Sequence, residues 1–311
     1  MQRNNRPTRS RWIVRPAVPR LNLAGFDVFG LDLTIEARQN GMFNYLQVPN
    51  SFRWSTLLRG FEAVHLSEMD CVALLRRVDT KYLLSEEQLS RVLARLTDHY
   101  RILEIDGRRL HNYQTLYFDT QDLALYQQHY NGWRNRYKVR ERVYADSELA
   151  FLEIKQKTNT DTTIKSRRRT RMLSPQLPQN AAPFLHRHYP YQMEELEAKL
   201  FNAFQRITLV STRSVERLTV DVGLQFSWNG VCVPLTGIAI AEVKQDGFSM
   251  DSEFIRQMRA LGVRATSFSK YCIGVSMLYP EVKHNKFKPQ LRQIDQLLYE
   301  GRTTCRPYSF H

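Results

Sequence analysis

The sequence lacks the features of a disulfide framework, a zinc site, a membrane span and a P-loop. Its 311 residues include four cysteines, which lie far apart and form no CxxC pair. The longest apolar run, residues 231–241, contains Pro234 and Gly237 and is too short to cross a bilayer. The glycines form no GxxxxGK loop. The scarcity of cysteine favours a reducing cytoplasm as the location of the protein.

What the sequence has in excess is positive charge. Lys and Arg number 45 against 31 Asp and Glu, which gives a formal net charge of +14. This excess indicates a polyanionic partner, and composition leaves open a nucleic acid, an anionic membrane or a polyphosphate. The sequence shows no helix-turn-helix, RNP-like or zinc-finger pattern, so we expect no specific nucleic acid partner.

The first part of the chain is basic and has no clear periodicity. Six arginines lie within residues 1–20, before the first acidic residue, Asp27, and no signal-peptide core follows them. Residues 1–60 are interpreted as a basic N-terminal extension, partly disordered, or as an arm that binds an anionic surface. We expect residues 61–283 to form the main domain, with 284–311 as a C-terminal helix and tail packed on it.

From residue 61 onward, the pattern predicts an α+β chain dominated by antiparallel strands. Ser85 and Gln88 form a capping box that predicts a helix to about residue 96. We expect further helices near 120–129, 193–206, 252–261 and 290–300. Strands are expected at 77–84, 111–119, 136–144, 149–157, 207–211, 217–226, 231–234 and 238–245.

Charged residues recur at every second position of five predicted strands, and such residues share one face of a strand. The other face of each strand is mostly apolar. An ordinary sheet with one solvated face gives the same alternation, but five strands together form a large surface of like charge. The charged faces comprise Arg77, Asp79 and Lys81; Lys138, Arg140 and Arg142; Glu153, Lys155 and Lys157; Arg217, Thr219 and Asp221; and Glu242 and Lys244.

A surface of this kind repels itself unless an anion neutralises it. If the sheet closes, the charged face lines a lumen of cations and a few carboxylates. Such a lumen suits a linear polyanion, with the carboxylates holding a divalent metal ion that bridges phosphate oxygens.

Seven segments, in this order, resemble the triphosphate tunnel metalloenzyme superfamily and, within it, the VTC-type polyphosphate polymerase domain. They span residues 76–275, about two-thirds of the chain. The resemblance implies a closed antiparallel β tunnel barrel with peripheral helices, formed by residues 61–283. The segments are RVDTKY (77–82), YFDT (117–120), YKVRER (137–142), FLEIKQK (151–157), RLTVD (217–221), AEVK (241–244) and SFSKY (267–271).

The resemblance also implies roles for individual residues. Those that act on the transferred phosphate would be Lys81, Arg140, Arg142, Lys155, Arg217 and Lys270. Those that bind the substrate would be Arg77, Lys138, Lys157, Arg213 and Lys244. Glu242 would be a ligand of Mn²⁺ or Mg²⁺, with Glu153 and Asp221 assisting the metal or orienting basic neighbours. Only three residues separate Arg213 from Arg217, which is shorter than the usual spacing in the family.

Membership of the polymerase branch implies transfer of the γ-phosphoryl group of ATP to a growing chain of inorganic polyphosphate. A tunnel triphosphatase or nucleotidyl cyclase of the same fold remains an alternative, as does a non-catalytic polyanion-binding module. The SPX and transmembrane domains that accompany this module in fungal proteins are not in the sequence. We therefore expect any membrane association to need a separate membrane-protein partner.

Overall fold

An antiparallel sheet organises the structure, a computed structural model that describes residues 51–72, 78–160, 162–247, 249 and 251–304. Eight strands follow one another in the order β2-β11-β9-β8-β4-β5-β6-β7, while β3 and β10 pair with β8 and β9. The strands are β1 (Glu62–His65), β2 (Val78–Ser85), β3 (Tyr100–Glu104), β4 (His111–Asp119), β5 (Arg136–Tyr144), β6 (Leu149–Lys157), β7 (Thr163–Thr170), β8 (Glu197–Ser211), β9 (Glu216–Trp228), β10 (Val231–Pro234) and β11 (Ile238–Gln245).

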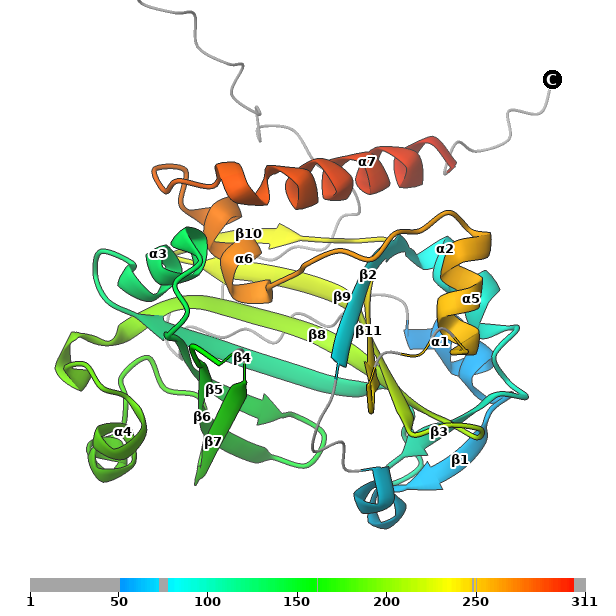
Figure 1. Ribbon diagram of the computed structural model, residues 1–311, viewed down its shortest axis with the longest axis horizontal. Coiled ribbons are helices and arrows are strands. Elements are labelled where there is room, and N and C mark those ends of the chain that lie inside the picture. Colours follow the sequence, from blue (N-terminus) through cyan, green and yellow to red (C-terminus); the bar gives the residue numbers. More distant parts are fainter. Residues whose placement is uncertain (1–50, 73–77, 161, 248, 250, 305–311) are drawn as a thin grey trace, which may run out of the picture. The chain divides into compact units, whose positions relative to one another are not determined.

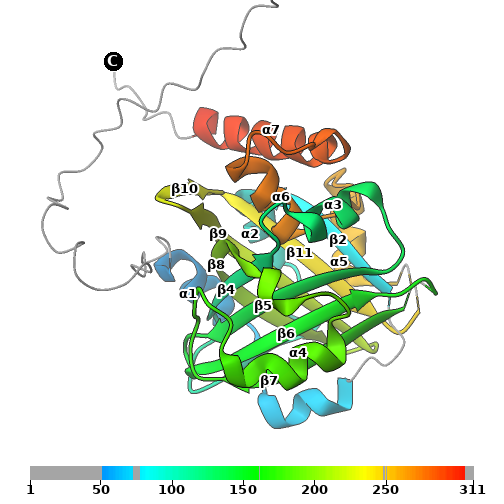
Figure 2. The ribbon, with the colours of Figure 1, turned by 90° about the vertical axis from the view of Figure 1, so that its left-hand side faces the viewer.

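The sheet curls, so that its two end strands lie on the same side of the molecule (Figures 1 and 2). Within the described residues, the hydrogen-bonded path ends at β2 and β7, which do not pair with each other. The short strand β1 pairs with β3 in parallel, and the other strand pairs are antiparallel. The expected α+β class with an antiparallel sheet and peripheral helices is confirmed.

Helices cover both faces of the sheet (Figure 1). Side chains of α1, α2 and α5 pack in one hydrophobic cluster, and those of α3, α6 and α7 pack in another. No helix among the described residues is long and apolar enough to span a bilayer. The helices are α1 (Ser51–Leu58), α2 (Glu86–Leu93), α3 (Ala124–Asn131), α4 (Ala182–His188), α5 (Glu253–Ala260), α6 (Lys270–Leu278) and α7 (Lys288–Thr304).

Strand alternation assigns the two clusters to opposite faces. On β11, Ala239 and Ala241 belong to the first cluster, whereas Ile238 and Ile240 belong to the second. Glu242 and Lys244 continue the face of Ile238 and Ile240. This face, which we call the inner face, is therefore apolar beneath α6 and charged beyond it.

Several predicted elements are confirmed. Strands β4, β5, β6, β10 and β11 have the expected bounds. In the capping box of α2, the Gln88 amide donates to Ser85 Oγ at 3.1 Å, and the Ser85 amide donates to Gln88 Oε1 at 2.9 Å. Ser252 caps α5 by accepting from the amide of Ile255 at 3.2 Å. Thr120 does not begin α3, although its Oγ1 accepts from the amide of Ala124, the first helical residue, at 2.8 Å.

The helix expected at 193–206 is wrong, because residues 197–211 form the long strand β8. Most side chains on both faces of β8 are buried. A strand buried on both faces carries a nearly continuous apolar run, which helical spacing can imitate. The sequence prediction also omits β1, β3, α4 and α6, and it leaves the basic segment of β7 without an element. Arg77 lies outside the described residues.

Candidate functional site

The expected charged side chains of five strands share the inner face. The strand register pairs Lys81 of β2 with Glu242 of β11. Toward the other end of the sheet, Lys155 of β6 lies opposite Lys138 of β5 and Lys165 of β7. The inner-face cluster consists of ten cations and three carboxylates: Lys81, Lys138, Arg140, Arg142, Lys155, Lys165, Arg206, Arg217, Lys244 and Lys270, with Glu153, Asp221 and Glu242.

Glu242 lies between two lysines. Its Oε1 is 2.7 Å from Nζ of Lys81, and its Oε2 pairs with Nζ of Lys244. Lys244 also donates to Oγ1 of Thr219 at 3.4 Å. Burial opposes the ionisation of Glu242, but the two ammonium groups outweigh it and hold the pKa of this carboxyl well below its usual range. The Glu242 side chain is 20% exposed, so a ligand in solvent can reach it.

Asp221 of β9 lies between Arg206 of β8 and Lys270 of α6. The Nε and Nη2 atoms of Arg206 donate to its two oxygens at 2.6 and 2.8 Å, and Lys270 pairs with the second oxygen. Burial opposes ionisation, but Arg206 and Lys270 outweigh it and lower the pKa of Asp221. The Arg206 guanidinium also lies over the ring of Tyr113, 4.9 Å from its centroid. Only 5% of the Asp221 side chain is exposed, so this carboxylate mainly positions the two cations.

Glu153 of β6 forms the third group of ion pairs. Arg140 donates to its Oε2 from Nε at 2.9 Å and from Nη2 at 2.7 Å, and Lys165 lies 2.5 Å from its Oε1. Burial raises the pKa of Glu153, but Arg140 and Arg142 outweigh that effect, and the pKa is lowered to about 2. The Glu153 side chain is 2% exposed. Like Asp221, it is a buried counter-ion that fixes the orientation of its neighbours.

Lys155 shows that the two ends of the curled sheet face a common interior. Its side chain is exposed to solvent, yet the surrounding protein and then Lys138 lower its pKa to about 8. Glu242 and Lys81, from the opposite end of the sheet, also act on this amine. Lys155 is therefore a solvent-exposed cation that lies within the electrostatic influence of charged groups from both ends of the sheet.

The segment before α6 contacts the inner-face cluster. Lys138 of β5 donates to Oγ of Ser269 at 3.0 Å, and Ser269 caps α6 by accepting from the amide of Cys272 at 3.2 Å. Lys270 follows as the first residue of the helix. The start of α6 therefore contacts β5 through Ser269 and β9 through Lys270.

The cluster is built to hold more negative charge than the protein supplies. Its ten cations exceed its three carboxylates by seven charges, and all three carboxylates are occupied by ion pairs. Burial lowers the pKa of Lys244 to about 8 as well, although it pairs with Glu242. An anion with many oxygens, spaced along a chain, would accept hydrogen bonds from these groups and offset their mutual repulsion.

The structure does not bring every predicted residue into the cluster. Arg213 is exposed in the turn between β8 and β9, and Arg206 occupies the position beside Asp221. Lys157 shares the face of Lys155 but lies at the end of β6, opposite Arg136 in register. Arg217 lies on β9 opposite Lys244, as expected from alternation.

Two residues of the cluster were missed by sequence reasoning. Arg206 was placed at the end of the incorrect helix, so the period of two was not applied to it. Lys165 precedes the arginine run of β7, a basic segment to which the sequence prediction assigns no element. Applying strand alternation to 163–170 would have placed Lys165 and Arg167 on one face, and Glu153 pairs with Arg167 in register.

The expected metal ligands fit only a metal site that the protein shares with water and the substrate. Among the described residues, no group of three His, Cys, Asp or Glu side chains is placed to hold an ion. Mg²⁺ is commonly held by one or two carboxylates together with water and substrate phosphates. Glu242, which is partly exposed, fits such a shared site, whereas the buried and doubly paired Glu153 and Asp221 do not.

The protein is therefore an α+β protein with a curled antiparallel sheet, flanking helices and a strongly cationic inner face. The family model described as "VTC domain" matches residues 76–279, and the chain belongs to this family. The resemblance drawn from the motifs is thereby confirmed. No curated protein matches the chain.

Solved structures with limited similarity cover about two-thirds of this chain. A putative adenylate cyclase from Bacillus halodurans is 14% identical with a TM-score of 0.40, and the match covers 65% of this chain and 97% of that one. A putative adenylyl cyclase from Hippeastrum, whose description reports a dominant triphosphatase activity, is 13% identical with a TM-score of 0.37. That match covers 66% and 100% of the two chains.

Proposed function

We propose that the protein is an ATP-dependent polyphosphate polymerase, which transfers the γ-phosphoryl group of ATP to a growing polyphosphate chain. The observation that carries this proposal is the excess of seven cationic charges in the inner-face cluster, whose residues come from strands at both ends of the curled sheet. Membership of the VTC domain family supports it. A chain of phosphates, rather than one compact anion, matches cations spread over several strands.

Phosphoryl transfer requires positioning and charge neutralisation more than covalent help from the protein. A terminal oxygen of the acceptor chain attacks the γ-phosphorus, the bond from that phosphorus to the β,γ-bridging oxygen breaks, and ADP leaves. Arg140, Arg142 and Arg217 would bind phosphate oxygens through their planar guanidinium groups, and Arg206 belongs with them. The lysines Lys81, Lys155 and Lys270 would supply further neutralising charge, with Lys138, Lys157 and Lys244 along the chain.

Glu242, together with the substrate, would hold a divalent ion, Mn²⁺ or Mg²⁺, which would supply positive charge to neutralise the phosphates. Glu153 and Asp221 would act as positioning residues for Arg140 and Arg206. These roles are supported by the burial of Glu153 and Asp221 and by the two cations that each of them pairs with.

Incubation of the full chain with ATP and Mn²⁺, followed by analysis of chain length, tests the proposal. We expect long-chain polyphosphate and ADP, and a loss of about 100-fold or more in rate for Arg140→Gln. The exposed Arg292→Gln on α7 is a matched control for loss of one charge and should retain activity. Free phosphate without chains would identify a triphosphatase, cyclic nucleotide with pyrophosphate a cyclase, and binding without turnover a polyanion-binding module.

A further inference from the structure

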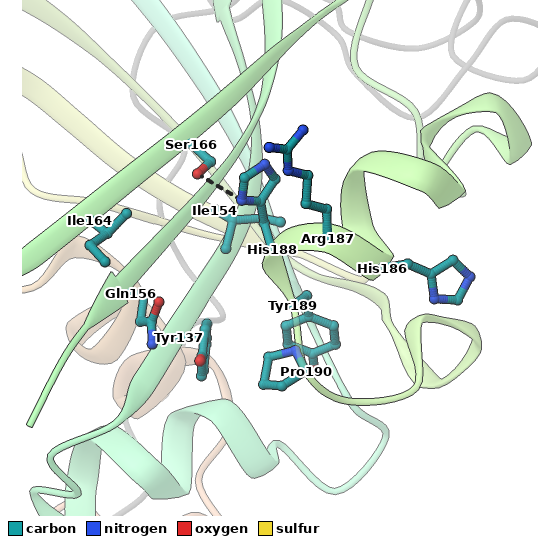
Figure 3. Close-up of a pocket in the computed structure, with 10 residues that line it drawn as sticks. All are labelled: Tyr137, Ile154, Gln156, Ile164, Ser166, His186, Arg187, His188, Tyr189 and Pro190. Atoms are coloured by element: carbon teal, nitrogen blue, oxygen red, sulfur yellow. Dashed lines mark hydrogen bonds between the residues drawn. The ribbon is translucent and has the colours of Figure 1, made fainter.

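A cavity lies on the outer face of strands β5, β6 and β7, which carry part of the inner-face cluster on their other face. It has a volume of about 310 Å³, within the range of small-molecule sites. Ile154 and Gln156 of β6 and Ile164 and Ser166 of β7 line it. These residues alternate with Lys155 and Lys165, so the cavity is on the opposite face from the inner-face cluster. Helix α4 and the residues after it form the other wall (Figure 3).

The polar groups of the cavity favour an anion. Arg187 and His188 of α4 line it, and none of its ten lining residues is a carboxylate. Ser166 Oγ lies 3.1 Å from Nδ1 of His188 (Figure 3), so Nε2 is the ring nitrogen that a ligand would meet. The Phe184 ring packs on His188 at 4.9 Å between centroids and fixes its position. A guanidinium, an imidazole and a hydroxyl together are typical partners of a phosphate group.

The rest of the lining suits an organic body rather than a bare inorganic ion. Ile154, Ile164 and Pro190 supply apolar surface. The rings of Tyr137 and Tyr189 meet edge to face at 5.9 Å and form an aromatic wall. Gln156 adds an amide that can donate and accept hydrogen bonds.

Tyr189 gives an independent indication of a ligand. Only 3% of this residue is exposed, and its hydroxyl has no hydrogen-bond partner within the described part of the chain. A buried hydroxyl without a partner is costly, and native structures rarely leave one so. Tyr189 lines the cavity, and a ligand that reaches this hydroxyl would satisfy it.

We propose that this cavity binds a nucleoside monophosphate, with the phosphate on Arg187, His188 and Ser166 and the base against the tyrosines and isoleucines. The site is separate from the inner-face cluster and does not depend on the reaction proposed for that cluster.

Calorimetric titration of the full chain with AMP tests the site. We expect wild-type binding, a loss of affinity of at least about tenfold for Arg187→Gln, and no change for Arg292→Gln. Arg187 is exposed, so its variant should fold normally. Tyr189→Phe should weaken binding about threefold to tenfold without lowering the Tm, because the hydroxyl has no partner to lose in the free protein. If Tyr189 had only a structural role, Tyr189→Phe would lower the Tm and leave the affinity for AMP unchanged.

Competition distinguishes binding in this cavity from binding to the inner-face cluster. Saturating tripolyphosphate should not displace AMP, and Arg140→Gln should bind AMP as the wild type does. Displacement of AMP by tripolyphosphate, unchanged AMP affinity in both cavity variants, or no AMP binding to the wild type would each overturn the proposal. Arg187-dependent binding of pyrophosphate without binding of AMP would also overturn it, since the site would then be specific for inorganic anions.

Discussion

Three carboxylates in similar surroundings differ in how far solvent reaches them. The side chains of Glu153 and Asp221 are almost fully buried, whereas the Glu242 side chain is 20% exposed. Each accepts two cations, but only Glu242 lies where a substrate-borne metal ion could displace part of an ion pair. The loss of stability on neutralising one of these carboxylates therefore depends on how deeply it is buried, because water cannot replace the partner of a buried cation.

Asp221→Asn should destabilise the protein strongly. It leaves the buried Arg206 and Lys270 without their shared counter-ion, and breaking a buried pair in this way typically costs about 3–5 kcal/mol. Glu242→Gln should cost clearly less, because 30% of the Lys81 side chain is exposed and water can replace the carboxylate there. Urea denaturation gives the free energy of unfolding of each variant, with the exposed Asp295→Asn on α7 as a control. Equal losses for Asp221→Asn and Glu242→Gln would refute the distinction.

At the scale of elements, the sequence predicted those strands that have one apolar and one charged face. Strands β5 and β6 alternate clearly, so their bounds and the inward placement of Arg140 and Lys155 could be inferred. Strand β8 is buried on both faces, and its apolar spacing therefore resembled a helix. This error hid Arg206. Pairing across the sheet could not be inferred either, because it depends on contacts between distant segments, such as Lys155 near Glu242.

Helix α6 places Lys270 in the cluster, and the close packing of this helix on the sheet requires Gly274. A Cβ added at Gly274 would lie 2.7 Å from both Leu200 Cδ2 and Phe226 Cδ1. Gly274→Ala should therefore lift α6 and cost about 1–3 kcal/mol of stability. Because Lys270 moves with the helix, affinity for tripolyphosphate should fall severalfold.

Thermal unfolding and calorimetric titration measure both effects of Gly274→Ala. Adding Leu200→Val removes the methyl carbons that the new Cβ would meet on that side, so the double variant should recover part of the stability and affinity. If Gly274→Ala retained full stability and affinity, the close packing of α6 would not be what places Lys270.

For the whole molecule, the relevant quantity is the excess of seven positive charges in the inner-face cluster. The surrounding protein and Lys138 lower the pKa of the exposed Lys155 to about 8, and burial lowers that of Lys244 to about 8, below the 10.5 of a free lysine. In the folded protein these amines resist protonation, so the unliganded protein should gain stability as the pH rises from about 8 toward 10.5. A bound polyanion favours the protonated, charged form of these two amines, whereas the unliganded protein favours the neutral form.

Affinity for tripolyphosphate should therefore fall as the pH rises through 8, although the unliganded protein becomes more stable over the same range. Between pH 7 and 9 each amine changes from mostly protonated to mostly neutral, and restoring its charge costs about tenfold in affinity per pH unit above its pKa. We expect a decline of at least about tenfold, together with proton uptake on binding, in titrations across buffers of different ionisation enthalpy. The double variant Lys155→Arg and Lys244→Arg stays charged and also controls for titration of the ligand itself. A decline of equal size in this variant and the wild type would show that these two lysines do not set the pH dependence.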